Sequence, residues 1–305
     1  MRIITLILAS VLAAVAYAQQ PQSFRTDDGE TLYYTRSGSG PRVVMLYGGP
    51  GFGASGMKDW LDSLSNQFET ILFEQRGTGL SKKVRLDSAT INVQRAYRDL
   101  DNLREHLGDN TLTLCGYSWG AMLALAYASY YPSNAQNLVL VGPGFIDTSL
   151  VVPFFDNLAR AMYPSERDSL AYWSSPETGS RDSVQAQLMR NVFSYMCNFY
   201  DHSAGRKVFE EYFRHIDYSP AMADLMWKSL YRGYDLKEPL KHYKGRCTII
   251  RPRQDNIPEE VVFSIVRSVP QTQVYYIERC GHAADLEKPN ELFRLLRRAL
   301  NPTGQ

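Results

Sequence analysis

Three side chains, Ser118, Asp255 and His282, have the types and the order along the chain that nucleophilic acyl transfer requires. A serine hydroxyl attacks a carbonyl carbon once a base takes its proton. Histidine is such a base when a carboxylate accepts a hydrogen bond from its other ring nitrogen and thereby fixes the tautomer. The three residues therefore predict hydrolysis through an acyl intermediate, with Ser118 as nucleophile, His282 as general base and Asp255 as the orienting acid.

The serine lies in Gly116-Tyr117-Ser118-Trp119-Gly120, between an apolar run and a helical pattern. In a sharp turn from a strand into a helix, glycines on both sides of the serine leave room for neighbouring backbone, and the turn lifts the hydroxyl above the carboxyl ends of the strands. The helix dipole favours negative charge that develops at the same place. An ordinary strand-to-helix turn is the alternative, and the flanking pattern favours the nucleophile.

The base and the acid both follow predicted strands. His282 comes just past the last strand, where a loop can carry its ring to the edge of the sheet that bears the serine, and a surface loop histidine is the alternative. Asp255 comes a few residues after the preceding strand and before a predicted helix, so a helix cap is the alternative for its side chain. Glu259 and Glu260 are the other acids that could take its place.

Two backbone N–H groups are candidates for stabilising the oxyanion of the transition state. One belongs to Trp119, directly after the serine, and the other to Gly49, in the loop 48–51 after the first buried strand. Glycine at such a position lets the backbone approach a substrate closely. A simple turn would need the same glycines, so the loop is consistent with an oxyanion donor at Gly49 but does not distinguish the donor from an ordinary turn.

Strands and helices must alternate to bring these residues together. Apolar runs predict eight strands, at 22–25, 31–35, 43–47, 71–73, 112–115, 138–141, 247–250 and 274–277. Helical spacing predicts helices at 93–107, 122–131, 259–269 and 291–300. This alternation implies an α/β fold with a mostly parallel eight-stranded sheet covered by helices on both faces.

A helical block interrupts this alternation. From about Phe145 to Leu236, aromatic residues and methionines recur at helical spacing without clear strands. Helices between two halves of one sheet are typical of an inserted cap. We therefore predict a core domain formed by 19–145 and 236–305, and a helical cap formed by 146–235.

Composition limits the kinds of partner. The 305 residues are 44% hydrophobic and 21% charged, as in an ordinary globular enzyme. The net charge is +1 and no long basic run occurs, so we expect neither a nucleic-acid partner nor attraction to an anionic membrane.

The first 18 residues resemble a secretory signal peptide. Arg2 precedes an apolar stretch from Ile3 to Ala16, and Ala16-Tyr17-Ala18 is a small-x-small cleavage signal. A membrane anchor is the alternative, but a spanning helix needs about 20 apolar residues and this stretch is shorter. We expect cleavage after Ala18, no stable membrane anchor, and a periplasmic or secreted mature enzyme.

Four cysteines occur in this chain, whose export would allow disulfides. Cys115, in a predicted strand, is expected to be a buried small apolar residue. Cys247 and Cys280 are expected at opposite ends of the sheet, too far apart for a bond that needs Cα atoms within about 7 Å. A Cys197–Cys280 disulfide is left open, because the sequence does not reveal pairing.

The glycine motifs carry a family resemblance. Gly48-Gly49-Pro50-Gly51, residues 75–81 (QRGTGLS), residues 116–120 and Gly281-His282 together resemble the proline iminopeptidase branch of the α/β hydrolases. The resemblance covers the core and fades in the cap. It implies the α/β-hydrolase fold and removal of an N-terminal residue, often proline, from short peptides, with no metal and no cofactor.

Two departures from the family concern the substrate. Tyr47 stands where family members usually have histidine, and it is a candidate substrate-binding residue. The family also binds the free amine of the substrate through acidic residues of the cap. Glu177, Glu210 and Glu211 are the candidates for that role, and solvated surface charges are the alternative for each.

Three hypotheses follow for a small peptide or ester substrate. The first is an exported aminopeptidase that acts on N-terminal residues, and the second is an esterase or other acyl hydrolase without a free-amine requirement. Epoxide hydrolase and dehalogenase chemistry is disfavoured, because those relatives use a carboxylate where this chain has Ser118. The third is a non-enzymatic binding protein on the same fold, which a complete triad disfavours.

Overall fold

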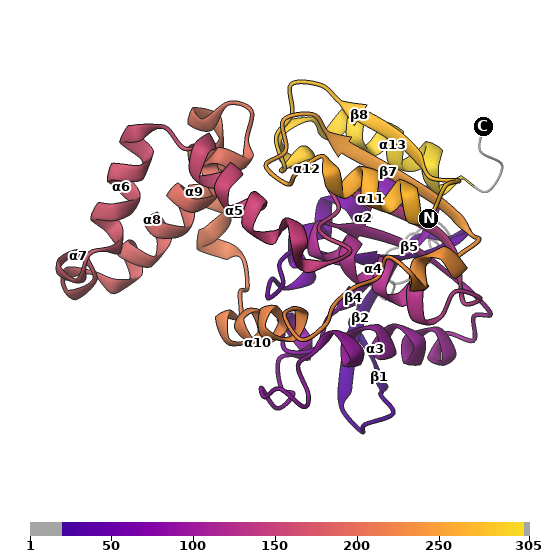
Figure 1. The fold of residues 1–305 in the computed structure, drawn as a ribbon. Helices are drawn as coiled ribbons and strands as arrows, with labels where there is room; N and C mark the ends of the chain where they lie inside the picture. Colours follow the sequence, from indigo (N-terminus) through magenta and orange to yellow (C-terminus); the bar gives the residue numbers. More distant parts are fainter. Residues whose placement is uncertain (1–19, 302–305) are drawn as a thin grey trace, which may run out of the picture.

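The computed structural model describes residues 20–301, in which eight strands form a single sheet (Figure 1). The strands are β1 (Gln22–Arg25), β2 (Thr31–Ser37), β3 (Arg42–Leu46), β4 (Glu69–Glu74), β5 (Leu112–Tyr117), β6 (Ala135–Val141), β7 (Arg246–Pro252) and β8 (Gln273–Ile277). Their order across the sheet is β1-β2-β4-β3-β5-β6-β7-β8. Within the described residues, strand β2 pairs antiparallel with β1 and with β4, and the other neighbouring strands of the sheet pair parallel. The predicted mostly parallel eight-stranded sheet is confirmed, whereas the predicted signal peptide, 1–18, lies outside the described residues.

The helices follow the predicted alternation. In the core they are α2 (Lys58–Leu64), α3 (Val93–His106), α4 (Trp119–Tyr130), α11 (Glu260–Ser268), α12 (Ala284–Glu287) and α13 (Pro289–Leu300). Between β6 and β7 they are α5 (Val151–Ala161), α6 (Pro164–Ser174), α7 (Pro176–Arg181), α8 (Ser183–Tyr195), α9 (His202–His215) and α10 (Pro220–Leu230). Short 3₁₀ helices occupy Ala54–Met57, Gly79–Ser81, Thr148–Leu150, Met196–Asn198 and Pro239–His242.

Both faces of the sheet are buried because successive strand residues point to opposite sides. In β3, Val44 and Leu46 pack in one core cluster with residues of α3, α4 and α11. Val43 and Met45 pack in a second cluster with residues of α2 and α13. Each strand therefore contributes alternately to two apolar layers, which explains why the central strands are nearly continuous apolar runs.

The order of the strands places a crevice at the carboxyl end of β3. The chain leaves β3 toward β4 on one side, but it leaves β5, on the other side of β3, toward β6. In open parallel sheets, ligands bind where the connections diverge in this way. The loop after β3 and the turn after β5 meet at this crevice.

The residues between β6 and β7 contain helices and no strand of the sheet. In Figure 1, α6 to α9 lie apart from the sheet, and α8 packs against α6, α7 and α9. In contrast, α10 packs against α3, and its residues Met222, Met226 and Leu230 belong to a core cluster. The predicted cap segment thus contains one helix whose apolar side completes the core. No helix within 20–301 is long and apolar enough to span a bilayer.

The cysteine thiols are all buried and free. Cys197 donates to the carbonyl of Ser194 and Cys280 to that of Gly281, so the Cys197–Cys280 disulfide left open by the sequence is not present. Burial raises the pKa of the Cys197 thiol to about 11. These side chains therefore serve as small apolar groups in the interior.

Helix α4 begins at Trp119, three residues before the predicted start at Met122. Every residue of α4 up to Ser129 is buried, so the helix has no polar face whose periodicity could mark its start. Gly120 lies in its first turn, where an added Cβ would be 2.0 Å from the carbonyl oxygen of Leu46 at the end of β3. The helix can rest on β3 only because this position has no side chain.

We predict that Gly120→Ala destabilises the protein by about 1–3 kcal/mol, because the new methyl group must displace backbone rather than a flexible side chain. Thermal or urea unfolding measures the loss. Gly179→Ala is the matched control, since Gly179 lies in α7 with no atom within 4 Å of an added Cβ. The control should be neutral or stabilising, because alanine favours helix more than glycine does. Equal effects of the two substitutions would contradict this account of α4.

Candidate active site

Ser118 occupies a sharp turn between β5 and α4. Its backbone has φ 55° and ψ −114°, a left-handed value that non-glycine residues rarely adopt. The Ser118 N–H donates to the carbonyl of Val141 at 2.9 Å, which ties the turn to β6. An added Cβ on Gly116 would lie 2.5 Å from the backbone of Gly120. Small residues on both sides thus allow the strained turn that points the serine side chain into a pocket.

His282 forms a hydrogen-bonded pair with Asp255. The distance from His282 Nδ1 to Asp255 Oδ2 is 2.9 Å, and the Asp255 side chain is fully buried. Tyr117 stacks on the imidazole with ring centroids 5.2 Å apart, and its hydroxyl donates to the His282 carbonyl. Gly142 leaves room for the pair, because an added Cβ there would approach both side chains to about 3.2 Å.

The charge state of Asp255 follows from its surroundings. Burial would raise the pKa of this carboxyl, but the charges of His282 and Arg251 and a hydrogen bond from the Ile257 N–H outweigh it, so the pKa lies below the ordinary 3.8. An ionised carboxylate only accepts hydrogen bonds. The proton of a neutral His282 must therefore be on Nδ1, which leaves Nε2 with the lone pair that a general base needs.

The structure favours neither a helix-capping role for Asp255 nor Glu259 or Glu260 as the acid that pairs with His282. Helix α11 has Glu259 at its N-cap, so Asp255 does not cap that helix. Glu259 accepts a hydrogen bond from Tyr276, and Glu260 is exposed at the start of α11. Neither glutamate contacts His282.

Arg251 is a member of this cluster that the sequence analysis missed. Its side chain is 3% exposed, and Nη1 donates to Asp255 Oδ2 at 3.0 Å, the oxygen that also accepts from His282. Its second terminal nitrogen donates to the carbonyl of Ile257. A charged residue inside an apolar strand was the available signal, since arginine is rarely buried without a partner.

The loop after β3 is joined to the serine turn through Gln75. The Gln75 side chain accepts a hydrogen bond from the indole N–H of Trp119 at 2.7 Å and donates to the carbonyl of Tyr47 at 3.1 Å. Gly49 lines the pocket with φ 132°, a value that favours glycine. The N–H of Trp119 is in the first turn of α4, where backbone donors have no partner within the helix. One buried side chain, that of Gln75, thus links the two segments that carry the predicted oxyanion donors.

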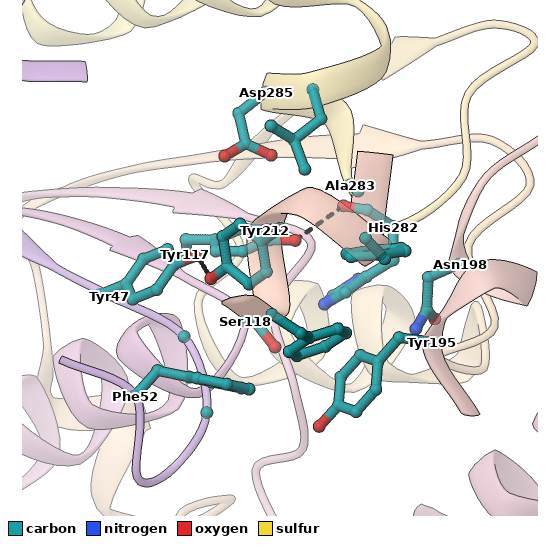
Figure 2. Close-up of a pocket in the computed structure, with 15 residues that line it drawn as sticks. Tyr47, Phe52, Tyr117, Ser118, Tyr195, Asn198, Tyr212, His282, Ala283 and Asp285 are labelled. Atoms are coloured by element: carbon teal, nitrogen blue, oxygen red, sulfur yellow. Dashed lines mark hydrogen bonds between the residues drawn. The ribbon is translucent and has the colours of Figure 1, made fainter. Parts of the chain in front are cut away.

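Ser118, His282, Gly49 and Tyr47 border one aromatic pocket (Figure 2). The cap contributes the pocket residues Tyr195, Asn198, Phe209, Tyr212 and Phe213. The core contributes the remaining lining residues, Gly48, Phe52, Tyr117, Ala283, Asp285 and Leu286. No hydrogen bond joins Ser118 to His282 among residues 20–301, although both side chains face the pocket.

Two cap segments contact the loops that carry these residues. Residues 217–219 pair with the loop after β3: Gly53 N–H donates to the Asp217 carbonyl and Ser219 N–H to the Gly51 carbonyl, both at 2.8 Å. The hydroxyls of Tyr47 and Tyr212 also form a hydrogen bond between loop and cap. Residues 197–199 lie against the histidine loop, since an added Cβ on Gly281 would be 2.2 Å from the Asn198 carbonyl oxygen.

The predicted amine-binding glutamates do not reach the pocket. Glu177 pairs with Arg181, Glu210 with Arg214, and Glu211 with His215, each across one turn of an exposed helix surface. None of the three lines the pocket. The helical spacing in the sequence does not reveal which side of each helix faces the core. In the structure all three glutamates are solvated surface charges.

The amino-acid sequence is similar to that of known hydrolases. A family model described as "alpha/beta hydrolase fold" matches residues 41–289. A proline iminopeptidase of Xanthomonas citri is 34% identical over 148 residues, which is 48% of this chain and 46% of that protein. One from Arabidopsis thaliana is 35% identical over 148 residues, 47% of this chain and 37% of that protein. The match thus spans less than half the length of these relatives.

Solved structures support the fold. An esterase from Rhodococcus has a TM-score of 0.65 at 16% identity and covers 91% of this chain and 97% of its own. A proline iminopeptidase-related protein from Thermus thermophilus has a TM-score of 0.69 at 20% identity, with 92% and 97% coverage. At such identities the likeness concerns the fold alone.

We predict that Arg251→Gln raises the pKa of Asp255, because it removes the permanent positive charge beside the carboxylate. A carboxyl group with a folded pKa below its unfolded value stabilises the fold above the unfolded value, and this contribution is lost as the pH falls through the folded pKa. The variant should lose about 1–3 kcal/mol of unfolding free energy at neutral pH. Its further loss between about pH 5 and pH 3 should be smaller than in the parent chain.

Urea unfolding at several pH values measures both effects. Arg267→Gln is the control, since it removes an exposed arginine of α11 whose side chain donates to the nearby Ser264 hydroxyl on the helix surface. It should keep the pH dependence of the parent. An Arg251→Gln variant with that same pH dependence would refute the coupling to Asp255.

Proposed function

The chain belongs to the α/β-hydrolase family, and we propose that it is a serine hydrolase with Ser118 as nucleophile, His282 as general base and Asp255 as orienting acid. One observation carries the proposal: a serine in a strained left-handed turn borders the same pocket as a histidine whose Nδ1 is hydrogen-bonded to a buried carboxylate. Strain of this kind persists where the surrounding structure enforces it and is concentrated at functional sites.

The proposed reaction has two halves. Ser118 Oγ attacks the scissile carbonyl carbon while His282 Nε2 takes the hydroxyl proton, and His282 then gives this proton to the leaving amine or alcohol. The acyl group remains on Ser118. A water molecule next attacks the same carbon, His282 takes its proton and returns it to Ser118, and the acid is released.

The oxyanion of both tetrahedral intermediates would be stabilised by backbone N–H groups of Gly49 and Trp119. The bond from Trp119 to Gln75 and the bond from Gln75 to Tyr47 link the two segments that carry these donors. Donors that are in position before the reaction need no reorganisation when charge develops, which is why they lower the barrier.

For the substrate we propose short peptides with a free N-terminus, so that the enzyme would be an aminopeptidase of the proline iminopeptidase type. The relatives from Xanthomonas citri and Arabidopsis thaliana bear that name. Aromatic walls from Phe52, Tyr195 and Phe213 suit a compact apolar ring such as that of proline. We also propose that the enzyme is exported, on the signal-like sequence of residues 1–18.

An esterase or other acyl hydrolase without a free-amine requirement is the alternative. The distance of Glu177, Glu210 and Glu211 from the pocket favours it, because these were the acids expected to bind an amine. Esterases among the structural neighbours have the same fold. Both functions use the same serine chemistry.

We predict that an uncharged aryl phosphonate labels Ser118, and that Ser118→Ala abolishes both labelling and turnover. The substitution removes the attacking oxygen, and alanine should leave the fold intact, as checked by the thermal midpoint. Peptide mass spectrometry identifies the labelled residue. Ser149→Ala is the control and should be labelled like the parent, because Ser149 lies in an exposed turn before α5. Labelling at another residue would refute the assignment.

We predict that the enzyme cleaves a prolyl arylamide with a free amine about 10- to 100-fold faster than the same compound with the amine acetylated, as expected for one charge-assisted hydrogen bond to the ammonium group. Comparing kcat/KM for the two substrates measures this ratio. Equal rates, or activity on simple esters alone, would support the alternative function and leave the role of Ser118 unchanged.

A further inference from the structure

Asp285 is a pocket carboxylate with no cationic partner. It lies three residues after His282, in the first turn of α12, and borders the same pocket as Ser118. None of the ion pairs within residues 20–301 includes it, and among the described lining residues it is the one carboxylate. Its side chain accepts a hydrogen bond from the indole N–H of Trp60 at 3.2 Å. The N–H groups of Asp285 itself and of Leu286 also stabilise the carboxylate, but all of these donors are neutral. A charge removed from water is usually paired with an opposite charge.

The groups around Asp285 do not neutralise it. Tyr47, Tyr117 and Tyr212 are close enough for the charge of Asp285 to raise their pKa values, after the larger effect of burial. Burial likewise raises the pKa of Asp285, although the bond from Trp60 and the nearby His282 lower it. In the view of Figure 2, the hydroxyls of Tyr117 and Tyr212 lie between the Asp285 carboxylate and Ser118.

This combination is suited to a cation. A carboxylate supplies the opposite charge, tyrosine hydroxyls can accept hydrogen bonds from an ammonium group, and the faces of aromatic rings attract cations. A neutral acyl group would gain nothing from Asp285, whereas an ammonium group would form an ion pair in a site largely shielded from water.

We propose that Asp285 binds an ammonium group on the acyl part of the substrate and thereby determines specificity. The inference rests on the proposed hydrolase function and assigns a residue to recognition of the substrate charge. The ammonium has two possible sources, the α-amine of an N-terminal residue or an amine at the end of its side chain. Both present the same chemistry to Asp285, and they differ in distance from the carbonyl that Ser118 attacks.

Three 4-nitrophenyl esters separate these sources: hexanoyl, 2-aminohexanoyl and 6-aminohexanoyl. All have the same acyl chain length and leaving group, so they differ in the presence and position of the ammonium. We expect the parent enzyme to prefer one ammonium substrate over hexanoyl in kcat/KM, corrected for spontaneous hydrolysis. Preference for 2-aminohexanoyl would identify an α-amine site, and preference for 6-aminohexanoyl a side-chain site. Either preference supports the proposal when Asp285→Asn removes it, because an α-ammonium group also makes the ester carbonyl intrinsically more reactive.

Asp285→Asn is the test variant, because asparagine keeps the size of the side chain and an oxygen that can accept from Trp60. It should lower kcat/KM for the preferred ammonium ester by about 10- to 100-fold and change the rate on hexanoyl by less than about 3-fold. The effect should be mainly in KM, since the lost contact serves binding. Asp224→Asn is the matched control: it removes the same charge from the exposed face of α10, where Asp224 pairs with Lys228.

The outcomes distinguish this inference from the proposed function. An equal loss on charged and neutral esters would mean that Asp285 maintains the shape of the pocket, and would overturn the inference. A parent enzyme that hydrolyses hexanoyl and is labelled at Ser118, but prefers neither ammonium ester, would also overturn it while leaving the hydrolase standing. Failure of both turnover and labelling at Ser118 would overturn the proposed function and this inference with it.

Discussion

The contact between the first turn of α4 and the end of β3 determines the geometry of the whole site. Gly120 has no side chain, so the helix approaches the carbonyl of Leu46 more closely than any other residue would allow. This approach forces a sharp turn at Ser118 and brings the turn next to the loop after β3. Gln75 then bonds to both segments, so Ser118 and the segments that carry the proposed oxyanion donors have one shared support. The sheet order makes this possible, because β3 and β5 are neighbours whose connections diverge.

Electrostatics at Asp255 complement this backbone constraint. The carboxylate is buried, and burial alone would favour its neutral form, which would be a poor partner for an imidazolium. Arg251 and His282 together keep it ionised, as the lowered pKa indicates. Arg251 and His282 donate to the same oxygen of Asp255, so the guanidinium shares this acceptor with the imidazole and also keeps the carboxylate ionised. Asp285 is the opposite case, because no ion pair within residues 20–301 includes this buried carboxylate, and we therefore propose that it binds the substrate.

Local sequence patterns predicted the elements and missed contacts between distant residues. The eight strands, the order of the elements and the turn at Ser118 follow from apolar runs and glycine positions, which act over a few residues. The start of α4 was misjudged because a fully buried helix has no polar side to delimit it. Asp285 was missed because its hydrogen bond comes from Trp60, more than 200 residues earlier. Arg251 was missed although Asp255 is only four residues away, because the sequence does not show that both side chains are buried together. The cap glutamates were misplaced because periodicity does not specify how helices dock.

The cap segments that touch the loops of the proposed active site limit how specificity can change in this protein. Residues 217–219 hydrogen-bond to the loop after β3, and residues 197–199 lie against the loop that carries His282, while α6 and α7 pack against α8. The cap is therefore not an interchangeable module. A chimera with a foreign cap would have different residues in the pocket wall, and it would also lose the hydrogen bonds to Gly51 and Gly53. Its selectivity would therefore change and its turnover would fall at the same time. Substitutions in the outer helices would not disturb these contacts. We expect residues 197–199 and 217–219, in contrast, to coevolve with the core loops that they contact.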